Sequence, residues 1–328
     1  HSEYSLLDGL SRISGLIRKA KEYGMPALAL TDHGAMYGAI DFYKKALKEE
    51  IKPILGCEIY MAAGDLADRK RQDAFHLTVL AKDLEGYKNL MKIVTIGQVE
   101  GFYYRPRVDM SVLKKYSKGL MATTGCPLSL VNSAIKEGQV KQAKITLERL
   151  VDVFGQEDFY IELQRHPFAE FAKEDQVPDE MRQQLGRYAK ETKLIEEQLI
   201  KFSREMSLPL VATNDVHYVE KEDAVAQDAI VCIQTGKKIA DIDRMRYIDS
   251  PDFYLKSTEE MRAAFMDLPE AIENTVKLSE KVDIQITLGQ WFFPKFGLPA
   301  GKTAGEMLRE KAYIGVKELF GGMGAEVK

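Results

Sequence analysis

The sequence predicts an α/β fold that curls into a barrel. Short apolar runs alternate with longer amphipathic ones, and at least six such strand–helix units come before residue 220. This alternation is typical of parallel strands joined by crossover helices. Polar side chains of metal-binding types follow most of the strands rather than lining one crevice, and reactive groups collect in this way at one rim of a barrel. We therefore favour a barrel over an open doubly wound sheet.

The spacing of apolar residues defines each expected element in turn. Apolar residues recur at helical intervals over residues 11–23, and Gly24 and Pro26 end that helix. Short apolar runs predict buried strands, at residues 27–30, 53–61, 76–81, 120–125, 158–163 and 209–214. Amphipathic runs predict further helices, at residues 37–50, 84–99, 128–154 and 179–206. We expect two helices within 128–154, with Pro127 suited to a first turn.

The pattern changes after residue 240. MRYIDSPDFYLKSTEEMRAAF predicts a turn, a strand and a helix whose capping box pairs Ser257 with Glu260. Residues 290–322 predict a Pro/Gly-rich linker followed by an amphipathic helix. We expect one domain over residues 1–284 and the incomplete start of a second over 285–328.

Composition limits the class of protein. A formal charge of −4 argues against a freestanding electrostatic DNA binder, although a local basic strip or bound metal ions could still serve a nucleic-acid substrate. Three cysteines without paired spacing predict a reduced, cytoplasmic protein. No apolar run reaches membrane-spanning length, so we expect no membrane partner. The chain begins at His1 without a methionine, and we expect the natural N-terminus upstream.

Four of the five histidines lie in short motifs at predicted strand ends, together with acidic residues and one cysteine. The candidate metal ligands are His1, Asp8, His33, Glu58, His76, Cys126, Asp215 and His217. Imidazole, carboxylate and thiolate suit Zn²⁺, Mn²⁺ or Fe²⁺ rather than an all-oxygen Mg²⁺ or Ca²⁺ site. Eight ligands exceed the need of one tetrahedral ion, so we predict two or three ions that share carboxylates. Such clusters activate water and clamp phosphoryl oxygens, which indicates phosphoester hydrolysis.

Each of these residues also has an ordinary structural explanation when it is taken alone. His76 could be a hydrogen-bonded core histidine, Cys126 a small buried hydrophobe, and Asp8 and Asp215 caps or turn residues. Their joint placement favours the metal site. No HExxH, Walker A, GxSxG or GxGxxG motif competes with it.

A basic and aromatic strip over residues 102–119 is a candidate DNA contact. Its candidate residues are Tyr103, Tyr104, Arg105, Arg107, Lys114 and Lys115. Aromatic stacking combined with cations suits a single-stranded end. The alternative is that the aromatic rings pack on the barrel and the charges are simply solvated.

Several long motifs resemble one known family. HSEYSLLDG, ALALTDHGAMYGAIDFYKKA, KPILGCEIYMA, TTGCPLS, VATNDVHYV and PDFYLKSTEEM are similar to the N-terminal PHP (polymerase and histidinol phosphatase) domain of bacterial DNA polymerase III alpha subunits of the DnaE type. The resemblance runs from residue 1 to about residue 280, and the remainder is similar to the start of the palm region. Residues 167–195 are more charged than is usual there, and we expect a solvated helical insertion.

The resemblance implies a distorted (β/α)₇ barrel of the PHP type that holds up to three metal ions. It implies nine ligands beginning with a His-x-His pair, of which His1 is the second member. One ion would bind that pair with Glu58 and Asp215. A second would bind Glu58, His76 and Cys126, and a third Asp8, His33 and His217. Asp32 is not a ligand in the family, so we expect it to orient ligands instead.

The resemblance also implies a function: a metal-dependent 3′→5′ proofreading exonuclease that hydrolyses the terminal phosphodiester of DNA, with His33, Asp215 and His217 as catalytic residues. Implied partners are a DNA 3′ end, the remaining domains of the polymerase chain, and a sliding clamp and clamp loader in a nucleoid-associated replisome. The chain stops before the family's palm carboxylates, so this fragment alone should not polymerise DNA. The alternatives are a catalytically silent metal-stabilised scaffold and a small-molecule phosphoesterase like histidinol phosphatase.

Overall fold

The computed structural model describes residues 1–69, 73–175, 177–242, 244–291, 293 and 296–321. The chain divides into two compact units, His1–Gln285 and Ile286–Lys328. The second unit contains one described helix, α12 (Ala304–Phe320), which begins with a capping box between Thr303 and Glu306. The predicted palm start at 285–328 falls partly outside the described residues, and its likeness to a palm stays a prediction.

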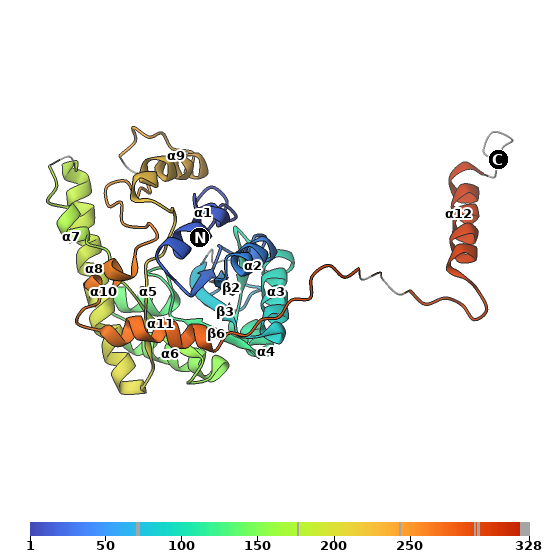
Figure 1. Ribbon diagram of the computed structural model, residues 1–328, viewed down its shortest axis with the longest axis horizontal. Helices are drawn as coiled ribbons and strands as arrows, with labels where there is room; N and C mark the ends of the chain where they lie inside the picture. The colour runs from blue at the N-terminus through green and yellow to red at the C-terminus, as the bar shows by residue number, and fades with distance from the viewer. Residues whose placement is uncertain (70–72, 176, 243, 292, 294–295, 322–328) are drawn as a thin grey trace. The chain divides into compact units, whose positions relative to one another are not determined.

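A curled sheet forms the centre of the first unit (Figure 1). Its wall runs in the order β1-β2-β3-β6-β7-β8, and the short hairpin β4–β5 joins β2. The strands are β1 (Ala27–Leu30), β2 (Lys52–Met61), β3 (Phe75–Ala81), β4 (Phe102–Tyr103), β5 (Arg105–Val108), β6 (Leu120–Thr123), β7 (Phe159–Gln164) and β8 (Leu210–Thr213). β2 is buried along almost its whole length, as expected of a strand covered on both faces.

Strand direction departs from the sequence prediction at one point. β1, β2, β6, β7 and β8 run the same way, but β3 is antiparallel to both β2 and β6. The prediction that all strands are parallel was therefore wrong for β3. Because β3 is reversed, its first residues lie at the same rim of the sheet as the last residues of the other wall strands.

The N-terminal segment spans the gap between β8 and β1, for which no strand pairing exists in the part of the chain that the structure describes. Beyond β8, the backbone nitrogen of His1 donates to the carbonyl of Val216 and that of Leu10 donates to the carbonyl of His217, both at 2.7 Å. On the other side, the backbone nitrogen of Ser2 donates to Asp32, just after β1, at 2.6 Å. The fold is thus mixed α/β with a curled sheet, consistent with the predicted distorted (β/α) barrel. Six strands form the wall among the described residues, one fewer than the predicted seven.

The first unit also contains helices, several of which pack against the strands of this wall. They are α1 (Ile13–Glu22), α2 (Ala39–Lys48), α3 (Leu84–Val99), α4 (Met110–Tyr116), α5 (Leu130–Lys136), α6 (Val140–Phe154), α7 (Phe168–Phe171), α8 (Asp179–Met206), η1 (Lys221–Asp223), α9 (Ala224–Thr235), α10 (Thr258–Ala264) and α11 (Pro269–Glu280). The two helices predicted within 128–154 are confirmed as α5 and α6, with Gly138 between them at φ +74°. Neither the hairpin β4–β5 nor helices α9 and α11 were predicted.

Of three local predictions about caps and a strand, one is confirmed and two are wrong. The capping box of Ser257 and Glu260 at α10 is confirmed. The strand expected before it is reduced to a single bridge between Tyr218 and Tyr254. Pro127 lies before the N-cap of α5, Ser129, and not in the first turn.

Residues 167–195 were expected to be a solvated insertion, and this was wrong for one face of the segment. The face that includes Phe168, Phe171, Met181 and Leu185 packs into a buried hydrophobic cluster with Phe253. None of the helices in the described residues combines the length and apolar character that crossing a membrane requires.

Candidate metal centre

All eight predicted ligands come together at one rim of the sheet. His33, Cys126, Asp215 and His217 follow the carboxyl ends of β1, β6 and β8, and Glu58 lies near the end of β2. His76 reaches the same rim from the beginning of the antiparallel strand β3. His1 and Asp8 come from the N-terminal segment that spans the open side of the wall.

Glu58 lies at the centre of this cluster. Its Oε1 is 2.9 Å from Nδ1 of His33 and 2.5 Å from Nδ1 of His76, and its Oε2 is 3.9 Å from Nε2 of His1. The Sγ of Cys126 lies 3.2 Å from the same Nδ1 of His76. Glu58 is only 4% exposed. One buried carboxylate thus faces three imidazoles from three parts of the chain.

A second set of contacts surrounds Asp8 and Asp215. Oδ2 of Asp8 is 3.1 Å from Nε2 of His33, and its Oδ1 is 3.8 Å from Nε2 of His217. Oδ1 of Asp215 is 3.2 Å from Nε2 of His1. Asp215 has φ +48°, a left-handed conformation that Asp tolerates better than most residues. This turn after β8 directs its carboxylate toward His1.

Three overlapping groups of ligand atoms are close enough to share an ion. They are His1, Glu58 and Asp215; His33, Glu58 and His76; and His1, His33 and His217. The first group agrees with the predicted grouping. The second contains His33 where the prediction has Cys126, and the third contains His1 where the prediction has Asp8. Cys126 and Asp8 nevertheless contact members of these groups.

Buried polar atoms without partners test whether these residues suit metal ions. Asp8 Oδ1, His33 Nδ1 and Glu58 Oε1 are buried and have no hydrogen-bond partner among the described residues. Burying such atoms unpaired costs about 1–3 kcal/mol each. Lone pairs that converge without hydrogen bonds are what ligands of a shared cation present. The mixture of N, O and S donors fits a divalent transition metal.

The charges of the cluster are strongly coupled. Burial disfavours the His33 cation, but the charges of Glu58 and Asp8 outweigh it and raise its pKa to about 10. Burial likewise opposes ionisation of Asp8, yet contact with His33 and the charge of His217 lower its pKa. Burial raises the pKa of the Cys126 thiol well above its usual value, with a contribution from Glu58. The pocket therefore attracts positive charge, either as protons or as metal ions.

Asp32 lies behind the cluster and holds the N-terminal segment in place. Its carboxylate accepts hydrogen bonds from the Ser2 hydroxyl and the Ser5 hydroxyl, both at 2.8 Å, in addition to the backbone nitrogen of Ser2. The Ser5 hydroxyl in turn lies 3.1 Å from Nδ1 of His1. This chain of contacts fixes the ring of His1, so its Nε2 faces Glu58 and Asp215.

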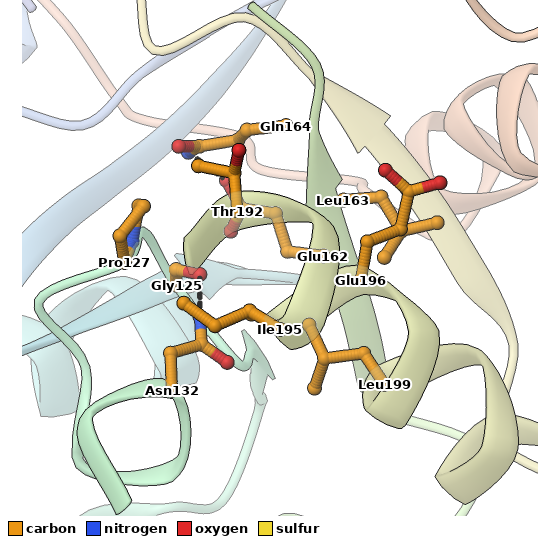
Figure 2. A pocket seen from close by; sticks show the side chains of 10 residues that line it. All are labelled: Gly125, Pro127, Asn132, Glu162, Leu163, Gln164, Thr192, Ile195, Glu196 and Leu199. Carbon is orange, nitrogen blue, oxygen red and sulfur yellow. Dashed lines mark hydrogen bonds between the residues drawn. The ribbon is translucent and has the colours of Figure 1, made fainter. Parts of the chain in front are cut away.

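Sequence reasoning missed a layer of polar groups below the cluster. The buried carboxylate of Glu162, in β7, accepts hydrogen bonds from the hydroxyls of Thr123 and Thr213 and from Gln164. Burial raises the pKa of Glu162. A cavity of about 20 Å³ lies beside it, next to Gly125 and Asn132, whose side chain donates to the Gly125 carbonyl (Figure 2). The charged residue inside the apolar run DFYIEL was the available signal.

The residues of the predicted DNA-contacting strip lie in different parts of the structure. Tyr104 and Arg105, in the β4–β5 hairpin, are exposed, and the Arg105 guanidinium lies 5.6 Å from the ring centroid of Tyr60. That ring is 5.2 Å from His76 and 6.2 Å from His33. Arg105 is therefore a cation at the rim of the cluster.

The other strip residues are placed differently. Arg107 is a correction: it is 1% exposed and donates to the backbone carbonyls of Asp68 and Asp73, so its guanidinium is not available to DNA. The Tyr103 ring is half-buried against it, 5.1 Å away. Lys114 and Lys115 are exposed in the last turn of α4, beside the amino end of β6 and so away from the rim.

Comparison with known proteins agrees with this geometry. A family model described as the PHP domain matches residues 1–166. DNA polymerase III subunit alpha of Borreliella burgdorferi is 43% identical over all of this chain and 27% of that relative. The subunits of Thermus aquaticus and Treponema pallidum are 37% and 35% identical, over 98% and 100% of this chain and 25% and 27% of theirs. The chain spans about a quarter of the length of these relatives. It belongs to the PHP domain family, in the form found in DNA polymerase III alpha subunits.

Proposed function

We propose that this chain is a metal-dependent phosphodiesterase that removes nucleotides from a DNA 3′ end, as the proofreading part of a DNA polymerase III alpha chain. The observation that carries the proposal is the buried cluster of eight N, O and S ligands with three overlapping ion-sized groups. A cluster this rich in carboxylates and imidazoles exceeds what folding of the rim requires. Two or three ions of Zn²⁺, Mn²⁺ or Fe²⁺ would suit it.

Metal ions bound there would supply an activated water and neutralise charge on a phosphoryl group. His1, Glu58 and Asp215 would hold one ion, and His33, Glu58 and His76, with Cys126 beside them, another. Asp8, His33 and His217 would hold the third ion of the proposal. The protein's own contribution is rigidity, because these ligands come from strand ends and buried positions.

We assign His33, Asp215 and His217 as the residues closest to the reaction. Each ring nitrogen of His33 faces a carboxylate, Nδ1 toward Glu58 and Nε2 toward Asp8, so the orientation of the ring is defined. Nδ1 of His217 lies 2.7 Å from the backbone carbonyl of Asp215, which directs Nε2 toward Asp8. Second contacts of this kind set the tautomer and raise the basicity of a ligand histidine.

The DNA end would approach over the β4–β5 hairpin. Arg105 would contact a phosphate, and Tyr104, 65% exposed, offers a face for a base. The polymerase context follows from the relatives, and it brings the further proposals of a sliding clamp and clamp loader as partners in a cytoplasmic, nucleoid-associated replisome. The relatives' length beyond this chain leaves room for polymerase domains in the same polypeptide.

A nuclease assay tests the proposal directly. The chain is loaded with Mn²⁺ or Zn²⁺ and given a 3′-recessed DNA labelled at its 5′ end, beside the His33→Ala and Asp215→Asn variants. We expect stepwise shortening from the 3′ end and its loss in both variants. Equal shortening by all three proteins would sink the proposal, since it would indicate a contaminating nuclease. Preferential turnover of a simple phosphate monoester would instead indicate a small-molecule phosphoesterase.

One observation favours a second function, in which the ions only stabilise the fold. The wall lacks strand pairing between β8 and β1 within the described residues, and the ligands His1 and Asp8 belong to the segment that spans this gap. Ions in the cluster would cross-link both sides. This scaffold function predicts that chelation lowers the melting temperature while no DNA shortening occurs under any metal.

A further inference from the structure

A tyrosine from a distant part of the sequence lies against the metal cluster. The ring of Tyr247 stacks on His217, with centroids 5.4 Å apart and planes 28° apart. Its other neighbour is Phe253, in an edge-to-face arrangement at 4.7 Å. Tyr247 therefore forms part of the wall of the cluster, on the side of His217, Asp8 and Asp215.

A buried ion pair holds the segment that carries Tyr247. Both terminal nitrogens of Arg244 donate to the carboxylate of Asp228, in α9, at 2.7 and 2.6 Å. Arg244 and Asp228 have side chains only 1% and 2% exposed. Paired, bidentate contacts of this kind fix geometry strongly. The segment is consequently anchored on α9, and the position of the Tyr247 ring beside His217 is set by the fold.

The hydroxyl of Tyr247 has no role in holding this arrangement. No described residue forms a hydrogen bond with it, and it is absent from the fully buried polar atoms that lack a partner, so it is reachable from outside. Ring stacking explains an aromatic residue at this position but does not explain a hydroxyl. A tyrosine phenol ordinarily titrates at about pH 10, so it is a neutral hydrogen-bond donor at neutral pH.

We propose that the Tyr247 hydroxyl donates a hydrogen bond to a non-bridging oxygen of the phosphoryl group bound at the cluster. The inference rests on the proposed phosphodiesterase function and adds a substrate-contacting residue to it. A neutral donor suits this position, because a negatively charged side chain would repel the phosphoryl group of the substrate. The hydroxyl is not one of the proposed ligand atoms, so its removal leaves the ligand set complete.

The test compares Tyr247→Phe with the wild-type chain. Phenylalanine keeps the ring contacts with His217 and Phe253 and removes only the hydroxyl. We expect kcat/KM for 3′-end hydrolysis to fall about 10- to 100-fold, the range of one hydrogen bond to a charged group. Inhibition by inorganic phosphate should weaken as well, while bound metal and melting temperature stay unchanged. Tyr116→Phe, on α4 and away from the rim, is the matched control and should resemble wild type.

The outcomes separate this inference from the function on which it rests. Wild type without activity contradicts the proposed phosphodiesterase. Active wild type with an equally active and equally phosphate-sensitive Tyr247→Phe variant overturns the role of the hydroxyl alone. Less bound metal or a lower melting temperature in Tyr247→Phe also overturns the proposed substrate contact, because the hydroxyl would then have a structural role.

Discussion

Nδ1 of His33 and Oε1 of Glu58 lie 2.9 Å apart, yet neither atom has a hydrogen-bond partner among the described residues. Two polar atoms at this distance normally share a proton along a direct line. Here the two atoms face common space without forming such a bond, together with the nearby Nδ1 of His76. Glu58 is therefore the residue through which the groups of the cluster are connected.

Glu58→Gln should remove metal from more than one position. Glutamine keeps the size of the side chain but loses the charge that faces three imidazoles. We expect the number of bound ions to fall, as measured by elemental analysis after dialysis. We also expect nuclease activity to fall at least about 100-fold, since even residues that only support ligands are worth 10- to 100-fold.

Glu162→Gln is the matched control for that variant. Glu162 is an equally buried glutamate of the same barrel, but its partners are hydroxyls and an amide below the cluster. Metal content should stay at the wild-type level. If the Glu58 and Glu162 variants bound equal amounts of metal, the central position of Glu58 would be refuted.

The metal-free protein should lose stability as the pH rises. The folded-state pKa of His33 is raised to about 10 from an ordinary value of 6.5, with burial opposing and the charges of Glu58 and Asp8 causing the shift. The stabilisation is fully present below pH 6.5 and is lost as the pH passes through about 10. Thermal melting of chelator-treated protein between pH 6.5 and 10 measures it.

His33→Gln provides the comparison, because it keeps a polar side chain that does not titrate. Its melting temperature should fall less over this pH range than that of wild type. Metal-loaded wild type should also be less sensitive, since a metal-bound imidazole is already deprotonated. Parallel pH profiles of the metal-free wild type and the variant would contradict the assignment.

The sequence predicted the ligands but not the direction of every strand. Alternating apolar runs locate a strand without giving its direction, and β3 was taken as parallel for that reason. The connection from Met61 to Phe75 contains no helix among its described residues, 62–69 and 73–74, whereas parallel neighbours require a long crossover. That missing helix was the signal. The error left the ligand set intact, because His76 reaches the rim through the reversed direction.

Residues whose role depends on remote packing were beyond the sequence patterns. Arg107 is charged and lies beside aromatic residues, so it resembled a surface contact, but burial turned it toward backbone carbonyls. Tyr247 belongs to no motif that spacing could single out, and only the fold brings it to His217. Local motifs thus locate the cluster, whereas its walls come from tertiary packing.

Asp32→Asn should loosen the N-terminal segment. The carboxylate accepts three hydrogen bonds from Ser2 and Ser5, and asparagine replaces one acceptor with a donor that faces those donors. We expect the free energy of unfolding to decrease by about 2 kcal/mol. Metal affinity at the group of His1 should also weaken. Urea denaturation and metal titration measure the two effects.

Asp41→Asn, on α2, is the control for Asp32. The side chain of Asp41 is 40% exposed and pairs with Lys45 one turn away, so its replacement should change stability by less than about 0.5 kcal/mol. A variant at Asp32 that was as stable as wild type and bound metal equally well would show that the N-terminal segment is held by other contacts.

Arg105 and Arg107 lie two residues apart and should respond to alanine in opposite ways. Arg105→Ala removes an exposed cation at the rim, so KM for DNA should rise several-fold with an unchanged melting temperature. Arg107→Ala removes a buried guanidinium that bonds the backbone carbonyls of Asp68 and Asp73, so unfolding free energy should fall by about 2–3 kcal/mol. Lys115→Ala should change neither quantity, since Lys115 lies away from the rim.

Steady-state kinetics at two salt concentrations and thermal melting of the three variants measure these effects. The salt dependence of KM should be reduced only in Arg105→Ala. An unchanged KM in that variant, or a raised KM in Lys115→Ala, would show that DNA approaches the cluster by a route other than the β4–β5 hairpin.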